Sequence, residues 1–183
     1  AGMGTLNNMF YIEDKNFLTK NQKNFIEDIT TKSDFPYYLI SNSTYNDASD
    51  FLSHIVKNRI EDFPDEKYNS NYHPQLTDIF FTFLIKNKIK MKQIYRMAVN
   101  LTYNNGKEKC NPHHDHEYEH RQFILYLNKP ADKDSKTIIL DKDKKIFKEV
   151  VPEKYKAICF DSHLHYHYYP KEGKRIVLVA TFN

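Results

Sequence analysis

The sequence predicts an α+β fold in which a jelly-roll barrel, or double-stranded β-helix, carries helices packed on its outside. In the first half, apolar residues recur at spacings of three and four, which is typical of helices with one buried face. In the second half, short apolar runs lie about ten residues apart between polar turns, which is typical of a sandwich or barrel. Helices with one apolar face need a sheet to lie on, and the second half supplies it.

Three helices are expected in the first half. The first begins near Thr19 and continues through Ile29 with apolar residues at helical spacing. The second is capped by Asp47, and its apolar stripe extends to residue 60. The third follows Pro74 and ends near Leu84. Two short strands, over residues 10–12 and 36–40, are expected between and before these helices.

Seven strands are expected in the second half. They span residues 94–103, 123–127, 137–140, 146–151, 156–160, 164–169 and 175–182. Alternate residues of the last strand share a face, so Arg175 is expected to point into the barrel beside Val177, Val179 and Thr181. No repeat or linker interrupts the chain. We therefore expect a single domain over 1–183, with 1–90 as helical support and 92–183 as the jelly-roll core that carries the site.

Composition excludes several classes of function. The chain is 40% hydrophobic and 15% aromatic, which indicates a folded domain rather than a disordered tail. A net charge of +3 is too small to indicate nucleic-acid binding, and no apolar run approaches the length of a membrane span. The two cysteines are too few for a disulfide framework, so we expect a reducing compartment, the cytoplasm.

Seven of the nine histidines fall in two short clusters, residues 113–120 and 163–167. In the first cluster His113 and Asp115 are two positions apart, so on a strand or at its edge both side chains face one way. Two histidines and one carboxylate on one face of an octahedron form the usual Fe(II) site of non-haem oxygenases. The third ligand is expected from the second cluster, where residues 163, 165 and 167 share a face.

These residues resemble the Fe(II)/2-oxoglutarate-dependent dioxygenases, most closely the prolyl hydroxylase-like branch. The shared pattern is a His-x-Asp pair, a strand ending in Tyr-Leu-Asn, a distal histidine, and a basic residue ten positions after it. Here it reads His113 to Asp115, Tyr126 to Asn128, His165, and Arg175. A tyrosine ten residues before the first metal histidine, here Tyr103, also matches. The resemblance covers residues 92–183, and residues 135–137 stand where that branch often has Gly-Gly.

The resemblance implies the cofactors and the residues that hold them. Fe(II) would be bound by His113, Asp115 and His165, and the far carboxylate of 2-oxoglutarate by Arg175 and Tyr126, with Tyr103 as a further cofactor-binding residue. A guanidinium offers a planar fork of donors that suits a carboxylate. O2 and ascorbate complete the expected cofactor set, and no side chain beyond the metal ligands is expected to be catalytic. The expected reaction hydroxylates a prolyl residue of a protein or peptide and releases succinate and CO2.

Several alternatives remain open at this point. His163, His167 and His116 are expected beside the metal ligands or at the substrate rim, and His114 and His120 in exposed loops. An oxygenase of the same fold acting on another side chain, a nucleobase or a small molecule would have the same site. A non-catalytic jelly-roll binding protein stabilised by a metal, a histidine-only zinc site and a surface turn capped by Asp115 are further alternatives. The oligomeric state is open, with a monomer favoured.

Overall fold

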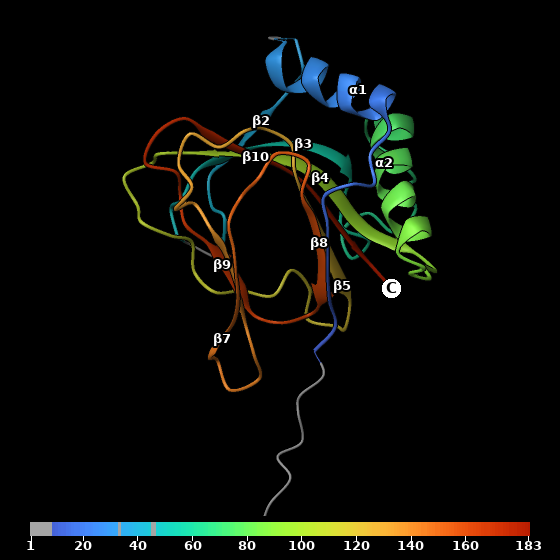
Figure 1. Cartoon of the computed structure of the whole chain (residues 1–183). Coiled ribbons are helices and arrows are strands. Elements are labelled where there is room, and N and C mark those ends of the chain that lie inside the picture. Colours follow the sequence, from blue (N-terminus) through green and yellow to red (C-terminus); the bar gives the residue numbers. More distant parts are fainter. Residues whose placement is uncertain (1–8, 33, 45–46) are drawn as a thin grey trace, which may run out of the picture.

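Two antiparallel β-sheets face each other in the computed structural model, which describes residues 9–32, 34–44 and 47–183. The strands of the larger sheet follow the order β1-β8-β5-β10-β4-β3-β2, and those of the smaller sheet the order β7-β6-β9. The larger sheet contains β1 (Tyr11–Asp14), β2 (Tyr38–Ile40), β3 (Phe51–Lys57), β4 (Ile94–Tyr103), β5 (Arg121–Tyr126), β8 (Ala157–Asp161) and β10 (Lys174–Phe182). The smaller sheet contains β6 (Thr137–Leu140), β7 (Ile146–Val150) and β9 (His165–His167). This is the predicted double-stranded β-helix (Figure 1).

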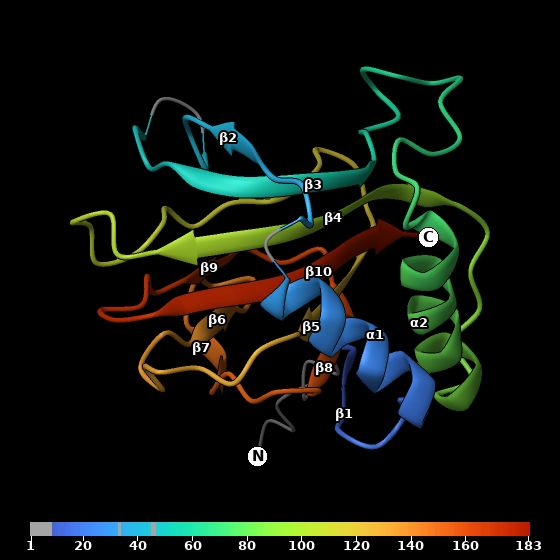
Figure 2. The same cartoon turned by 90° about the horizontal axis from the view of Figure 1, so that it is seen from above.

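Two helices cover the outer face of the larger sheet (Figure 2), counted over the described residues. Helix α1 (Lys20–Thr31) begins at Thr19, whose hydroxyl accepts a hydrogen bond from the Gln22 amide while the Gln22 side chain accepts one from the Thr19 amide. Helix α2 (His73–Lys86) buries Phe80 and Phe83 against Phe123 of β5. Neither helix is long and apolar enough to cross a membrane.

Strand alternation divides the side chains of the larger sheet between two environments. On β10, Ile176 and Leu178 face the helices and belong to the main hydrophobic core. Val177 and Val179 face the smaller sheet and belong to a second core. Arg175 shares this inner face and lines the cavity between the sheets, as predicted. The inner face of the larger sheet is therefore where polar residues can be held against an apolar wall.

The helix predicted from Asp47 to residue 60 is wrong, because residues 51–57 form strand β3. This strand pairs with β4, with Leu52 opposite Leu101 and Ile55 opposite Ala98. Both of its faces are buried, so its apolar residues do not alternate and are compatible with a helical spacing as well. Asp47 caps no helix; its carboxylate accepts hydrogen bonds from neighbouring loop residues instead, including the Ser49 amide at 3.0 Å.

Candidate metal and cofactor site

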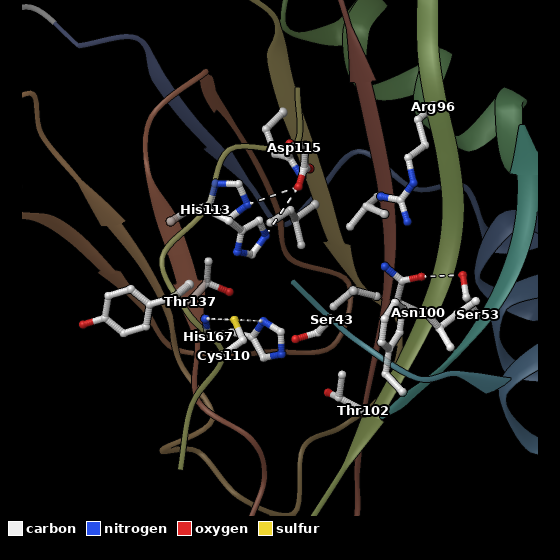
Figure 3. A pocket seen from close by; sticks show the side chains of 18 of the residues that line it. Ser43, Ser53, Arg96, Asn100, Thr102, Cys110, His113, Asp115, Thr137 and His167 are labelled. Atoms are coloured by element: carbon white, nitrogen blue, oxygen red, sulfur yellow. Dashed lines mark hydrogen bonds and ion pairs between the residues drawn. The ribbon is translucent and has the colours of Figure 1, made fainter. Parts of the chain in front are cut away.

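A cavity of about 380 Å³ lies between the two sheets. Strands β3, β4 and β10 form one wall, and β6, β9 and the segment before β5 form the other. Figure 3 shows polar side chains from both walls pointing into this space. Both histidine clusters contribute to it, although about fifty residues separate them in the sequence.

Backbone pairing brings the two clusters together. His113 and His165 form an isolated antiparallel bridge, in which the amide of each donates to the carbonyl of the other at 3.0 and 3.2 Å. Asp115 follows two residues later, and the guanidinium of Arg59 donates to its backbone carbonyl. The positions of His113, Asp115 and His165 are therefore fixed by main-chain contacts and not only by their side chains.

The three side chains converge on one point. The Asp115 Oδ1 atom lies 3.5 Å from His113 Nε2 and 3.8 Å from His165 Nε2, and all three ligand atoms lie within 4.8 Å of one another. Ligands at about 2.1 Å on adjacent octahedral positions are about 3 Å apart. A small inward movement of these side chains would therefore complete a site for a divalent cation, with its remaining positions facing the cavity.

The far nitrogen of each imidazole has a backbone partner. His113 Nδ1 lies 2.8 Å from the Asn111 carbonyl, and His165 Nδ1 lies 3.0 Å from the His163 carbonyl. A carbonyl only accepts hydrogen bonds, so both rings carry a proton on Nδ1, which leaves Nε2, on the side of Asp115, as the atom that can bind a metal ion. Histidines that bind metal ions are oriented in this way in many proteins. The donor set thus fits Fe(II), for which two imidazoles and a carboxylate are suitable ligands.

Electrostatics favour an ionised carboxylate at this point. Burial raises the pKa of Asp115, but the hydrogen bond from His113 and the positive charges of His113 and Arg96 outweigh it, so the pKa lies well below its usual range. Burial lowers the pKa of His165 to about 4, which keeps that ring neutral. In His113 the interaction with Asp115 overcomes the effect of burial and raises the pKa to about 10. The site therefore attracts a positive charge to Asp115.

A buried arginine lies at another part of the same cavity. Arg175 is only 4% exposed, and its guanidinium donates to the Thr137 hydroxyl at 2.8 Å. The Tyr126 hydroxyl lies 2.6 Å from the same Thr137 oxygen, and the Tyr126 ring lies 5.5 Å from the guanidinium carbon. Arg175 Nε has no hydrogen-bond partner, and no carboxylate of the described residues forms an ion pair with it. A buried, uncompensated guanidinium fits one carboxylate of 2-oxoglutarate.

Solved structures with this arrangement of strands were found by comparison. A 2OG-Fe(II) oxygenase family oxidoreductase from Burkholderia pseudomallei superposes with a TM-score of 0.70 at 12% identity, over 94% of this chain and 84% of that one. A Trichoplax adhaerens prolyl hydroxylase in complex with a hypoxia-inducible factor peptide gives 0.66 at 12% identity, over 96% and 84%. The chain has the fold of the 2OG-Fe(II) oxygenases.

The same fold serves more than one reaction among these neighbours. A non-heme alpha-ketoglutarate-dependent epimerase of nogalamycin biosynthesis gives a TM-score of 0.59 at 10% identity, over 95% of this chain and 78% of that one. No protein-family model matches the sequence, and no curated protein sequence matches it either. At these identities the likeness establishes the oxygenase fold, and the reaction has to be argued from the site.

Two predicted positions, Tyr103 and His163, lie elsewhere than expected. Tyr103 is on the opposite face of β4 from the cavity and packs against the main core, so the prediction that it binds the cofactor is wrong. Its neighbour Thr102 faces the cavity instead, because side chains alternate along the strand. His163 precedes β9 and lines a separate surface hollow, so only its carbonyl supports the metal site. The residue thus lies beside a proposed metal ligand, as expected, but it does not line the cavity itself.

Two of the remaining histidines, His116 and His120, differ from the prediction as well. His116 is buried rather than at the substrate rim, and its two ring nitrogens contact Glu61 and Thr181, each at 2.7 Å. His120 is also buried, whereas His114 is exposed as expected. His167 does line the cavity, where its Nδ1 lies 3.4 Å from the Cys110 sulfur.

Sequence reasoning missed several residues that line the cavity. Thr137 joins Tyr126 to Arg175, and strand alternation on β6 was the only signal that could have placed it there. On β4, Arg96 and Asn100 share the inner face with Thr102, and the same alternation could have found them. Arg59 lies in a loop after β3, where the sequence carries no comparable periodicity.

Proposed function

We propose that the protein is an Fe(II)- and 2-oxoglutarate-dependent dioxygenase, formed by one domain over residues 1–183. The observation that carries the proposal is that the cavity holds two complementary features. One is the convergence of His113, Asp115 and His165, and the other is the buried, uncompensated guanidinium of Arg175. A structural metal site alone would account for the first feature but not for the second.

The chain's own residues have distinct tasks in this proposal. His113, Asp115 and His165 hold the iron, which with 2-oxoglutarate and O2 supplies the oxidising chemistry that hydroxylates a carbon centre and yields succinate and CO2. Arg175 and the Thr137 hydroxyl bind the far carboxylate of 2-oxoglutarate, and Tyr126 holds Thr137 in place. No side chain needs to act as an acid or base.

Apolar residues complete the pocket around these polar groups. The cavity is also lined by Val177 and Val179 of β10 and by Ile124 of β5, which belong to the second core. They limit the access of water, which strengthens the interaction of Arg175 with an anion and restricts stray oxidation. The pocket is thus suited to a small dicarboxylate held at one end by a metal and at the other by a guanidinium.

We propose a prolyl residue of a protein or peptide as the substrate, in a monomer of the reducing cytoplasm with ascorbate keeping the iron reduced. The pattern of residues around the site and the peptide-bound prolyl hydroxylase among the neighbours support this choice. The two cysteines are free buried thiols, which suits a reducing compartment. An oxygenase acting on another side chain, a nucleobase or a small molecule is the second candidate, favoured by the epimerase with the same fold.

Succinate formation tests the proposal. The protein is incubated with Fe(II), 2-oxoglutarate and O2, and succinate is quantified by mass spectrometry with and without proline-containing peptides. We expect succinate from the wild-type protein and a peptide that gains one oxygen. Asp115→Ala should abolish both products, while His163→Ala, whose ring is outside the cavity, serves as the matched control. Metal binding without any succinate would instead indicate a non-catalytic binding protein.

A further inference from the structure

A second positively charged region lies in the same cavity, away from Arg175. Arg96 is on the inner face of β4, partly buried, and its side chain points into the cavity (Figure 3). Among the described residues no carboxylate forms an ion pair with its guanidinium, and no side-chain hydrogen bond to it is present. An arginine that lines a cavity without an anionic partner is a binding group for an anion from outside the chain.

Sheet register separates Arg96 from the proposed 2-oxoglutarate site. Arg175 pairs with Thr102 at one end of β4, whereas Arg96 pairs with Thr181 at the other. Thr102 is six positions after Arg96, which corresponds to about 20 Å at the usual rise per residue in a strand. One small dicarboxylate that already spans from the metal to Arg175 cannot also reach Arg96. Arg96 is therefore available to a different molecule.

Arg59 strengthens the positive charge at this end of the cavity. Its guanidinium lines the cavity and is held in place by the bond it donates to the Asp115 carbonyl. Burial and the charge of Arg59 lower the pKa of Arg96 to about 10, so Arg96 is still protonated at neutral pH. The charges of Asp115 and Glu61 offset part of this positive charge, but among the described residues neither forms an ion pair with Arg96: Asp115 lies beside His113 and His165, and Glu61 lies 2.7 Å from His116. Asp62 also lines the cavity, and no ion pair joins it to Arg96 or Arg59 within the described part of the chain.

An amide on the same strand extends this surface along β4. The Ser53 hydroxyl donates to the Asn100 side-chain oxygen at 2.8 Å, which leaves the Asn100 amide nitrogen as a donor at the cavity wall. Arg96 and Asn100 are four residues apart on one face, about 13 Å along the strand. An extended molecule with an anion at one end and a carbonyl further along could contact both.

We propose that the substrate of this site carries a carboxylate that binds Arg96, with Arg59 beside it, at the end of the cavity opposite Arg175. The inference rests on the proposed oxygenase function, since it assigns the substrate of that same site. The carboxylate can come from an acidic side chain next to the target residue of a peptide, or from a free amino acid. The metal ligands line the facing wall of the same cavity, so a substrate held by Arg96 is bound in the space that the iron would face.

Matched pairs of neutral and anionic probes test this assignment in a binding experiment. Calorimetry under anaerobic conditions, with Fe(II) and saturating 2-oxoglutarate, compares N-acetyl-L-proline with its amide, and capped Asp-Pro with capped Asn-Pro dipeptides. We expect the carboxylate member of at least one pair to bind about tenfold tighter or more. The pair that shows the difference identifies the source of the carboxylate, a free acid or an acidic side chain.

Variants separate recognition by Arg96 from a merely structural role. Arg96→Gln should remove the preference for the carboxylate, whereas Arg121→Gln, a surface arginine that pairs with Asp161, should keep it. Equal binding of both members of each pair, or no measurable binding of any carboxylate probe, would overturn the proposal. A preference for the carboxylate that survives Arg96→Gln would also overturn it. The same holds if Arg96→Gln lowers only the affinity for Fe(II), because Arg96 would then merely position Asp115. The binding experiment needs no turnover, so it tests the role of Arg96 independently of catalysis. Absence of succinate in the turnover assay would count against the oxygenase function and not against the binding of a carboxylate by Arg96.

Discussion

Replacement of Arg175 by methionine tests the most unusual feature of the cavity. The guanidinium is buried, has one hydrogen bond to Thr137, and leaves its Nε unpartnered. A bound carboxylate would gain two charge-assisted hydrogen bonds from it, each worth about 1.5–3 kcal/mol. Loss of both should cost about 3 kcal/mol or more, which corresponds to roughly a hundredfold weaker binding of 2-oxoglutarate.

Thermal unfolding under anaerobic conditions with Fe(II) measures this loss without turnover. At a 2-oxoglutarate concentration of about 100 times Kd, the wild-type protein should gain about 2.7 kcal/mol, which raises Tm by roughly 5–11 °C for a chain of this size. At the same concentration Arg175→Met is about half saturated, gains about 0.4 kcal/mol, and should shift by only about 1–2 °C.

The variant without 2-oxoglutarate provides an internal check on folding. Removal of a buried charge that lacks a counter-ion is often neutral or stabilising, so the Tm of Arg175→Met without ligand should equal or exceed that of the wild type. Arg121→Met changes a partly exposed arginine and should leave the 2-oxoglutarate shift intact. If Arg175→Met folds normally and retains the full shift, Arg175 does not bind the co-substrate and the reasoning fails.

Two further variants probe contacts on either side of the larger sheet. Thr137→Val removes the hydroxyl shared by Tyr126 and Arg175 and leaves a buried phenol without its partner. We expect the free energy of unfolding, measured in urea, to fall by about 1–3 kcal/mol and the binding of 2-oxoglutarate to weaken. An unchanged affinity for 2-oxoglutarate would exclude Thr137 from the co-substrate site. Burial lowers the pKa of His54 from its usual 6.5, despite a hydrogen bond to the Pro36 carbonyl. The neutral ring of His54 therefore contributes its full stabilisation above pH 6.5, and this contribution is lost as the pH falls below 6.5. Wild-type stability should therefore fall between about pH 7.5 and 5.5 by more than that of His54→Gln; equal slopes would show that His54 does not titrate in this way.

Most strands of the second half could be predicted because their sequence pattern and their environment agree. Residues 137–140 form β6 as predicted, and residues 94–103 form β4. Strand β3 could not be recognised because neighbouring residues face different cores. Val56 is buried against the helices and Ile55 faces the inner side, so the alternation of apolar and polar residues that identifies a half-buried strand is absent.

The site could be predicted where chemistry restricts the residue type. His113 and Asp115 were singled out by their spacing, and the resemblance to the dioxygenases singled out His165 among three histidines that share a face; the structure brings these three residues together. Tyr103 was misplaced because a spacing of ten residues does not specify the face of the strand, and the metal-bearing loop lies between it and His113. Arg59 depends on the conformation of a loop, on which a single sequence gives almost no information.

Backbone register explains why His165, rather than His167, is the proposed ligand although both face the cavity. The segment before β5 lies antiparallel to β9, with His113 bonded to His165 and the Cys110 amide bonded to the His167 carbonyl. Each histidine of β9 therefore meets a different partner: His165 meets His113 and Asp115, and His167 meets the thiol of Cys110. Because alternate residues of a strand share a face, a shift of two residues would bring His167 opposite His113 and still leave its ring on the cavity side. The ligand is thus selected by the main-chain hydrogen bonds of the His113–His165 bridge, and the identity of the side chain alone is not sufficient.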